Sequence, residues 1–123
     1  MPGTPGDKRA FVRLSKSLTL RYKVVKIPKS AGTAPNTEEM RASTKDISAG
    51  GLAFYCKEKL PPLSILEVRL SMPGDEQPVL CLAEVVRVRV VENTPFCDTA
   101  LHFLDLSSHD RRILDKFVQK EMK

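Results

Sequence analysis

The 123-residue chain is short of several residue types that mark other classes of protein. It has no tryptophan, and aromatic residues make up 6% of the sequence. Its three cysteines, Cys56, Cys81 and Cys97, are widely spaced and form no C-x-x-C pair. Disulfide frameworks and zinc sites use closer or paired cysteines, so neither is expected here. We predict three buried, reduced thiols.

Long apolar runs are also missing. No segment approaches the roughly eighteen apolar residues that a membrane-spanning helix needs. The first seven residues are rich in proline and glycine and lack the apolar core of a signal peptide. We predict a cytoplasmic protein with a flexible leader at residues 1–7 and one domain over residues 8–123.

The residue patterns of common catalytic sites are absent as well. The sequence contains no P-loop, no dinucleotide-binding glycine motif and no nucleophile elbow. Of its two histidines, His102 lies in an apolar segment and is interpreted as a core residue, whereas His109 is expected to be exposed. We therefore predict that the chain is not an enzyme and holds no metal or cofactor.

Positive charge is what the sequence has in excess. Lysine and arginine number 20 against 15 acidic residues, which gives a net charge of +5 and a pI near 9.3. Much of this excess lies in the first 29 residues, where the one acidic residue is Asp7. Such a local cationic field favours an anionic partner, although a solvated charged face would have the same composition.

Alternating apolar and polar residues predict a mainly β fold. Six strands are expected at about residues 18–27, 41–47, 52–56, 66–70, 79–91 and 99–103, with a long loop over residues 28–40. In the fifth strand, Val86, Val88 and Val90 are expected to face away from a basic face that carries Arg87 and Arg89.

Near the C-terminus the apolar period changes from two to that of a helix. The pattern predicts a helix over residues 108–121, and Ser107 followed by Asp110 resembles a capping box at its start. Consecutive short strands joined by turns favour an antiparallel sheet that closes on itself. The predicted fold is a six-stranded antiparallel β-barrel with a C-terminal α-helix.

Two short motifs carry the functional hypothesis. Arg9 and Arg13 are four residues apart and follow Lys8 in the basic N-terminal segment. Guanidinium groups can bind guanine edges bidentately, stack on bases and pair with phosphate. Two solvated arginines remain the alternative for this pair.

The second motif is Asp46-Ile47-Ser48-Ala49-Gly50-Gly51. An ionised Asp46 can accept hydrogen bonds from the N1–H and N2–H groups of guanine, and Ser48 can donate to a phosphate oxygen. Gly50 and Gly51 are expected to permit positive φ and a close approach of the backbone to a ligand. The alternative is an ordinary Asx-type turn between two strands.

In their order and in the surrounding strand plan, these motifs resemble the PilZ domain family. Arg9 and Arg13 match its R-x-x-x-R motif, and Asp46, Ser48 and Gly51 match its [DN]-x-S-x-x-G motif. The similarity extends over roughly residues 8–120. It implies a receptor for cyclic di-GMP, a bacterial second messenger, with Lys8, Gly50 and both motifs forming the pocket.

The resemblance further implies a stand-alone adaptor that acts on a downstream effector protein, with roles such as motility or biofilm regulation. We expect the segment from Lys8 to Ser17 to become ordered when ligand binds. Two alternatives stay open: a PilZ-like barrel that acts through protein contacts alone, and a small barrel that binds RNA or single-stranded DNA. The second is disfavoured because such barrels usually present several aromatic residues for base stacking.

Overall fold

The computed structural model describes residues 14–29, 38–74 and 77–121. These residues form six strands and one helix in the predicted order. They are β1 (Thr19–Lys26), β2 (Met40–Ile47), β3 (Gly51–Cys56), β4 (Ile65–Leu70), β5 (Val79–Val90), β6 (Cys97–Phe103) and α1 (Ser108–Glu121). The predicted leader at residues 1–7 and most of the predicted loop, residues 30–37, lie outside the described ranges.

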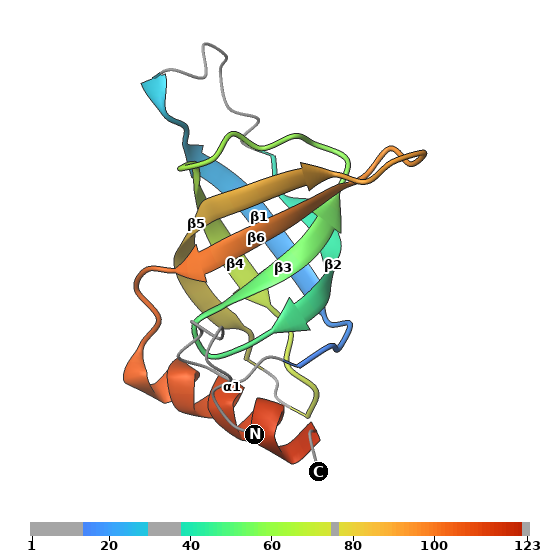
Figure 1. The fold of residues 1–123 in the computed structure, drawn as a ribbon. Coiled ribbons are helices and arrows are strands. Elements are labelled where there is room, and N and C mark those ends of the chain that lie inside the picture. Colours follow the sequence, from blue (N-terminus) through green and yellow to red (C-terminus); the bar gives the residue numbers. More distant parts are fainter. Residues whose placement is uncertain (1–13, 30–37, 75–76, 122–123) are drawn as a thin grey trace, which may run out of the picture.

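The six strands form a closed antiparallel barrel, which confirms the predicted fold class (Figure 1). The order around the barrel is β1-β2-β3-β6-β5-β4, and β4 returns to pair with β1. Every neighbouring pair is antiparallel. Closure satisfies the backbone hydrogen bonds of strands that would otherwise be edges.

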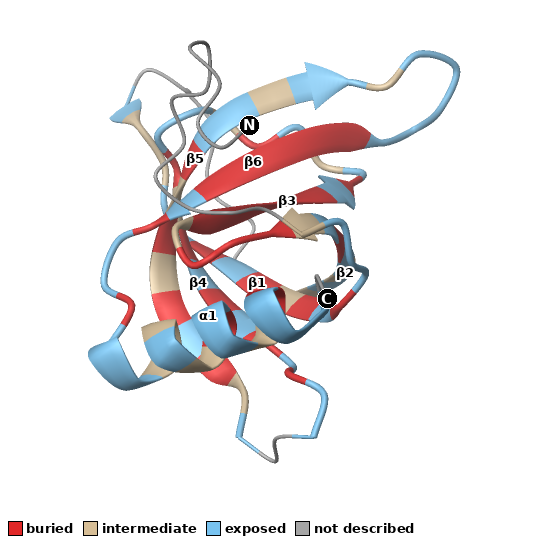
Figure 2. Cartoon of the chain, turned by 60° about the horizontal axis from the view of Figure 1, so that its bottom comes forward, coloured by how far each residue is buried: buried red, intermediate tan, exposed pale blue. Residues whose placement is uncertain are grey.

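The barrel interior is the core of the protein, as the burial colours of Figure 2 show. Strand alternation puts Leu20, Tyr22 and Val24 of β1 inside while their neighbours face out. The rings of Tyr22 and Phe54 meet there at a tilt of 52°, with centroids 5.2 Å apart, a favourable geometry for two aromatic rings.

Strand β5 departs from simple alternation in its second half. The pairing between β5 and β6 shifts register between Val85 and Arg87, which marks a β-bulge. Beyond this point Val86 and Val90 are exposed, at 53% and 63%, and Val88 is half-buried. The prediction that these three valines share one face is therefore wrong at Val86, the extra residue of the bulge, whereas Val88 and Val90 stand opposite the buried Thr99 and Cys97.

Helix α1 lies across one end of the barrel (Figure 1). The Ser107 hydroxyl accepts a hydrogen bond from the Asp110 N–H at 3.0 Å, which confirms the predicted cap. Leu114 and Val118, four residues apart on one face, are buried in the barrel core. The helix therefore acts as a lid that shields the apolar interior from water.

The remaining predictions about single residues have mixed outcomes. All three cysteines are buried and unpaired, as predicted. His109 is exposed as predicted, but His102 is exposed too, so its assignment to the core is wrong. Leu101 and Phe103 point inward on either side of His102, and the alternation of β6 turns the imidazole out.

Two searches concern the described part of the chain. None of its helices has the length and apolar character needed to cross a membrane. Over the same ranges, no group of three or more His, Cys, Asp or Glu side chains is placed to hold a metal ion.

Candidate ligand-binding site

The turn between β2 and β3 is held together by the hydroxyl of Ser48. The Ser48 oxygen accepts hydrogen bonds from the N–H groups of Gly50 and Gly51 at 3.2 and 3.3 Å, and the Ser48 N–H donates to the Gly51 carbonyl at 2.9 Å. Ser48 is 1% exposed. The turn considered as the alternative is thus present, and the Ser48 hydroxyl organises it.

Gly51 is required by the neighbouring strand. A Cβ atom at this position would collide with the backbone carbonyl oxygen of Leu101 on β6. The expectation of positive φ at Gly50 and Gly51 is wrong. Among the glycines that the structure describes, only Gly74 has a positive φ. The lack of a side chain at Gly51 serves the close packing of β3 on β6.

Asp46 lies near the end of β2, just before this turn, and is half-buried. The pairing of β2 with β3 shifts between Thr44 and Asp46, and Asp46 then stands opposite Ala53. Ala53 in turn pairs with Ala100 of β6. Beside Asp46, this face of the sheet therefore carries the small side chains of Ala53 and Ala100, both of which are buried.

The chain that follows the first motif is fixed to the second. Leu14 forms an isolated antiparallel bridge with Ile47. The Leu14 N–H donates to the Ile47 carbonyl at 2.8 Å, and the Ile47 N–H donates to the Leu14 carbonyl at 2.9 Å. Ile47 is the residue between Asp46 and Ser48. The described chain thus begins against the turn motif, at the residue immediately after Arg13.

Helix α1 contributes a cation that sequence reasoning missed. The Arg111 guanidinium donates a hydrogen bond to the Ala49 carbonyl at 2.9 Å. A hollow of about 520 Å³ lies beside this contact, lined by Ala49, Ser108, Arg111, Arg112 and Asp115. No local signal marks Arg111, because its partner is 62 residues away in the sequence.

A second missed feature is an ion pair on the outer surface of the same sheet. Lys45 Nζ lies 2.7 Å from Asp98 Oδ2, and the hydrogen bond to Asp98 raises the pKa of Lys45 above its ordinary value. The other Asp98 oxygen is buried and has no hydrogen-bond partner among the described residues. The ion pair therefore satisfies one oxygen of this carboxylate and leaves the buried one unsatisfied among the described residues.

The predicted site residues divide into two groups. Asp46, Ser48, Gly50 and Gly51 lie together at the β2–β3 turn, at the end of the barrel that α1 covers (Figure 1). Lys8, Arg9 and Arg13 lie outside the described residues.

Fold and site together define a class: a small closed barrel, capped by a C-terminal helix, with a serine-held turn on its surface. A family model described as the PilZ domain matches residues 7–120. The chain therefore belongs to the PilZ domain family. A comparison with curated protein sequences finds no significant match.

Several solved structures share this fold. The Bacillus subtilis inhibitor of motility MotI/DgrA superposes with a TM-score of 0.75 at 19% identity, covering 94% of this chain and 51% of that one. The PilZ domain of YcgR from Escherichia coli with c-di-GMP gives 0.65 at 15% identity, covering 94% and 95%. The K. pneumonia MrkH–c-di-GMP complex gives 0.69 at 18% identity, covering 94% and 52%.

The present chain thus spans about half the length of MotI/DgrA and MrkH and nearly all of the YcgR PilZ domain. At these identities the likeness shows the fold alone.

Proposed function

We propose that this protein is a receptor for cyclic di-GMP. The observation that carries the proposal is the pair of hydrogen bonds between Leu14 and Ile47. They fix the chain immediately after Arg13 to the residue between Asp46 and Ser48. Arg13 directly precedes Leu14 in the sequence. The neighbours YcgR and MrkH, whose structures hold c-di-GMP, support the choice of ligand.

In this proposal each motif has a distinct chemical task. Arg9 and Arg13, with Lys8, supply charge-assisted hydrogen bonds to phosphate and to guanine O6 and N7. The Asp46 carboxylate accepts hydrogen bonds from one guanine edge. Because the Ser48 hydroxyl is buried, accepts from the turn N–H groups and donates to the Gly51 carbonyl at 3.3 Å, its task is to hold the turn in the shape that the ligand meets.

The output is a change of surface rather than a reaction. Bound ligand fixes the segment that carries Arg9 and Arg13 against the barrel, and a downstream effector protein reads the new surface. The predictions that the protein is not an enzyme and acts in the cytoplasm belong to this proposal, because an adaptor of this kind needs neither catalysis nor export.

Calorimetric titration of the full chain with cyclic di-GMP tests the proposal, with cyclic di-AMP and a single-stranded oligonucleotide as parallel ligands. We expect saturable binding of cyclic di-GMP and much weaker binding of cyclic di-AMP. Absence of cyclic di-GMP binding would leave a PilZ barrel that works through protein contacts alone. Tight, salt-sensitive binding of the oligonucleotide would favour the nucleic-acid alternative.

A further inference from the structure

At the end of the barrel opposite the Ser48 turn, β2 and β3 are not paired over the full length of β2. The ladder between β2 and β3 begins with Ser43 opposite Tyr55, although β2 itself begins at Met40. Continuing the same register would place Lys57 opposite Arg41, but β3 ends at Cys56. Within the described part of the chain, Arg41 therefore has no partner residue on β3.

Two hydrogen bonds explain why β3 turns away here. The Tyr22 hydroxyl donates to Glu58 Oε1 at 2.9 Å, and the Cys56 thiol donates to the Glu58 carbonyl at 3.0 Å. Burial, with Cys56 and Glu58 nearby, raises the pKa of Tyr22, so this phenol remains a donor. Both contacts hold Glu58 over the barrel mouth and keep the chain after Cys56 away from β2.

The free side of β2 presents a backbone donor and acceptor. The Thr44 N–H donates to the Leu18 carbonyl at 2.9 Å, so the groups of Thr44 point toward β1. Because backbone groups alternate along an antiparallel strand, those of Ser43 and Arg41 point to the other side. Ser43 meets Tyr55 there, whereas Arg41 faces the gap. Such a strand edge is a template for an added strand.

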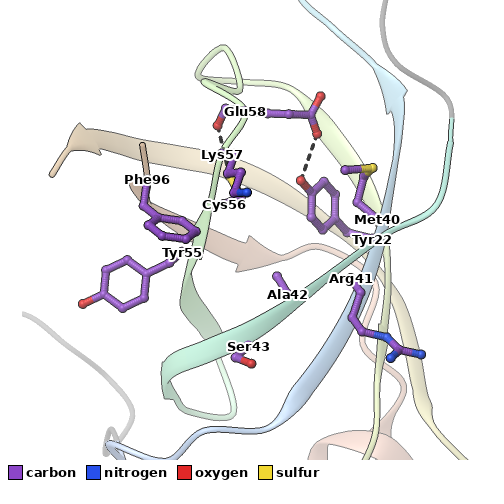
Figure 3. Close-up of a pocket in the computed structure, with 10 residues that line it drawn as sticks. All are labelled: Tyr22, Met40, Arg41, Ala42, Ser43, Tyr55, Cys56, Lys57, Glu58 and Phe96. Carbon is purple, nitrogen blue, oxygen red and sulfur yellow. Dashed lines mark hydrogen bonds between the residues drawn. The ribbon is translucent and has the colours of Figure 1, made fainter. Parts of the chain in front are cut away.

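A cavity of about 380 Å³ opens at this gap (Figure 3). Tyr55 and Phe96 line one side of it, and Tyr22 and Met40 line the other. Tyr55 and Phe96 are 41% and 38% exposed, which is much for two aromatic side chains in a small protein. The cavity can therefore accept an apolar side chain, and it lies beside the part of β2 that is not paired with β3.

Of the charged residues that line this cavity, Arg41 and Lys57 are positive and Glu58 is negative. Lys57 lies 6.0 Å from the centre of the Phe96 ring. Arg41 belongs to a row of three arginines directly opposite one another across β2, β1 and β4, namely Arg41, Arg21 and Arg69. Like charges in directly opposed positions are destabilising. Within this row Arg21 forms an ion pair with Glu39, at 3.8 Å between exposed groups, and a cationic surplus remains.

We propose that this surface, Arg41–Ser43 with Tyr55, Lys57 and Phe96, docks an extended acidic segment of a partner protein. The segment adds a short strand to β2 and bonds the Arg41 backbone. One apolar side chain sits between Tyr55 and Phe96, and flanking carboxylates meet Lys57 and the arginine row. A peptide fits better than a nucleic acid, because the gap offers a strand edge to a polypeptide backbone. This site is separate from the proposed ligand site.

The test is selection of random short peptides displayed on phage against the immobilised full chain, followed by affinity measurement on synthetic versions of the peptides selected. We expect peptides that combine Asp or Glu with an aliphatic or aromatic residue. Phe96→Ser and Lys57→Glu should each weaken binding about tenfold, as changes at the centre of an interface do. Leu63→Ser and Lys116→Glu, matched changes at exposed positions elsewhere, should leave affinity unchanged.

Strand addition is tested separately with N-methylated peptides. Methylation of the peptide N–H that pairs with Arg41 should abolish binding, and the Arg41 and Ser43 amide signals should shift when the unmodified peptide is added. The proposal is overturned if no peptide is selected, if selected peptides are basic or neutral, or if Phe96→Ser leaves their affinity unchanged. Displacement of the peptides by a single-stranded oligonucleotide would assign the surface to nucleic acid instead.

Discussion

Single residues at the β2–β3 turn have structural tasks that their place in a ligand motif does not reveal. Ser48 holds the turn by its hydroxyl, and Gly51 lets β6 approach. Asp46 differs, because it is half-buried beside the small side chains of Ala53 and Ala100. Changes at Ser48 and Gly51 should therefore act on stability as well as on binding, and Asp46 offers the cleaner test of ligand recognition.

Gly51→Ala should destabilise the fold. The new methyl group would overlap the Leu101 carbonyl, a backbone atom that cannot swing away. We expect a loss of about 1–3 kcal/mol in unfolding free energy, typical of an overpacked site. Urea unfolding followed by circular dichroism measures it. Ser43→Ala, at an exposed position on β2, is the control and should change stability by less than about 0.5 kcal/mol. Equal stability of both variants would contradict the close approach.

Asp46→Ala should reduce selectivity for guanine more than affinity for phosphate. A carboxylate that accepts two N–H groups discriminates between bases by about 1–3 kcal/mol. The measurement is the ratio of dissociation constants for cyclic di-GMP and cyclic di-AMP, before and after the change. If the ratio stays the same, Asp46 does not read guanine.

Alkaline pH should weaken the fold through Cys81. Burial, with Asp105 and Asp110 nearby, raises the pKa of this thiol from 9.0 to about 12. The folded state then keeps a proton that the unfolded state loses, so stability is constant below about pH 9 and falls as the pH rises toward 12. The fall approaches about 1.4 kcal/mol per pH unit.

Urea unfolding of the wild type and of Cys81→Ala between pH 8 and 10.5 isolates this effect. The stability advantage of the wild type should shrink as the pH rises. An advantage that stays constant across this range would show that the thiol keeps an ordinary pKa.

At the scale of elements, apolar periodicity predicted most of what is observed. All six strands and α1 lie within a few residues of their predicted ranges, because one face of each element is buried in a single core. The second half of β5 was mispredicted because a bulge near Val86 depends on how β6 pairs with it. The contact between Arg111 and Ala49 was missed because it exists only once α1 has docked.

The N-terminal cap of α1 can be tested alone. Ser107→Ala removes the acceptor for the Asp110 N–H and should cost about 1 kcal/mol of unfolding free energy. Ser108→Ala, one residue further on at an exposed position, should cost much less. Thermal or urea unfolding distinguishes them, and equal losses would mean that Ser107 does not act as the cap.

At the scale of the whole molecule, contacts between segments far apart in the sequence build the candidate site. The sequence motifs lie more than thirty residues apart, and in the proposed site the Leu14–Ile47 bridge at the end of β2 brings the chain that follows the first motif to the second. The order of the motifs and the strand plan made the family predictable. The proposed docking surface around Phe96 and Arg41 was not predictable from the sequence, because its cavity is lined by residues from three strands and a hairpin.

The measurement that tests the central claim most directly is calorimetric titration of cyclic di-GMP into the wild type and Arg13→Ala. Loss of one set of charge-assisted contacts, about 1.5–3 kcal/mol, predicts binding weaker by about 10- to 100-fold. Arg69→Ala, which removes an exposed arginine on β4, is the matched control and should bind like the wild type. Saturable wild-type binding that Arg13→Ala weakens is the predicted result. No wild-type binding, or equal affinity in Arg13→Ala, would contradict it.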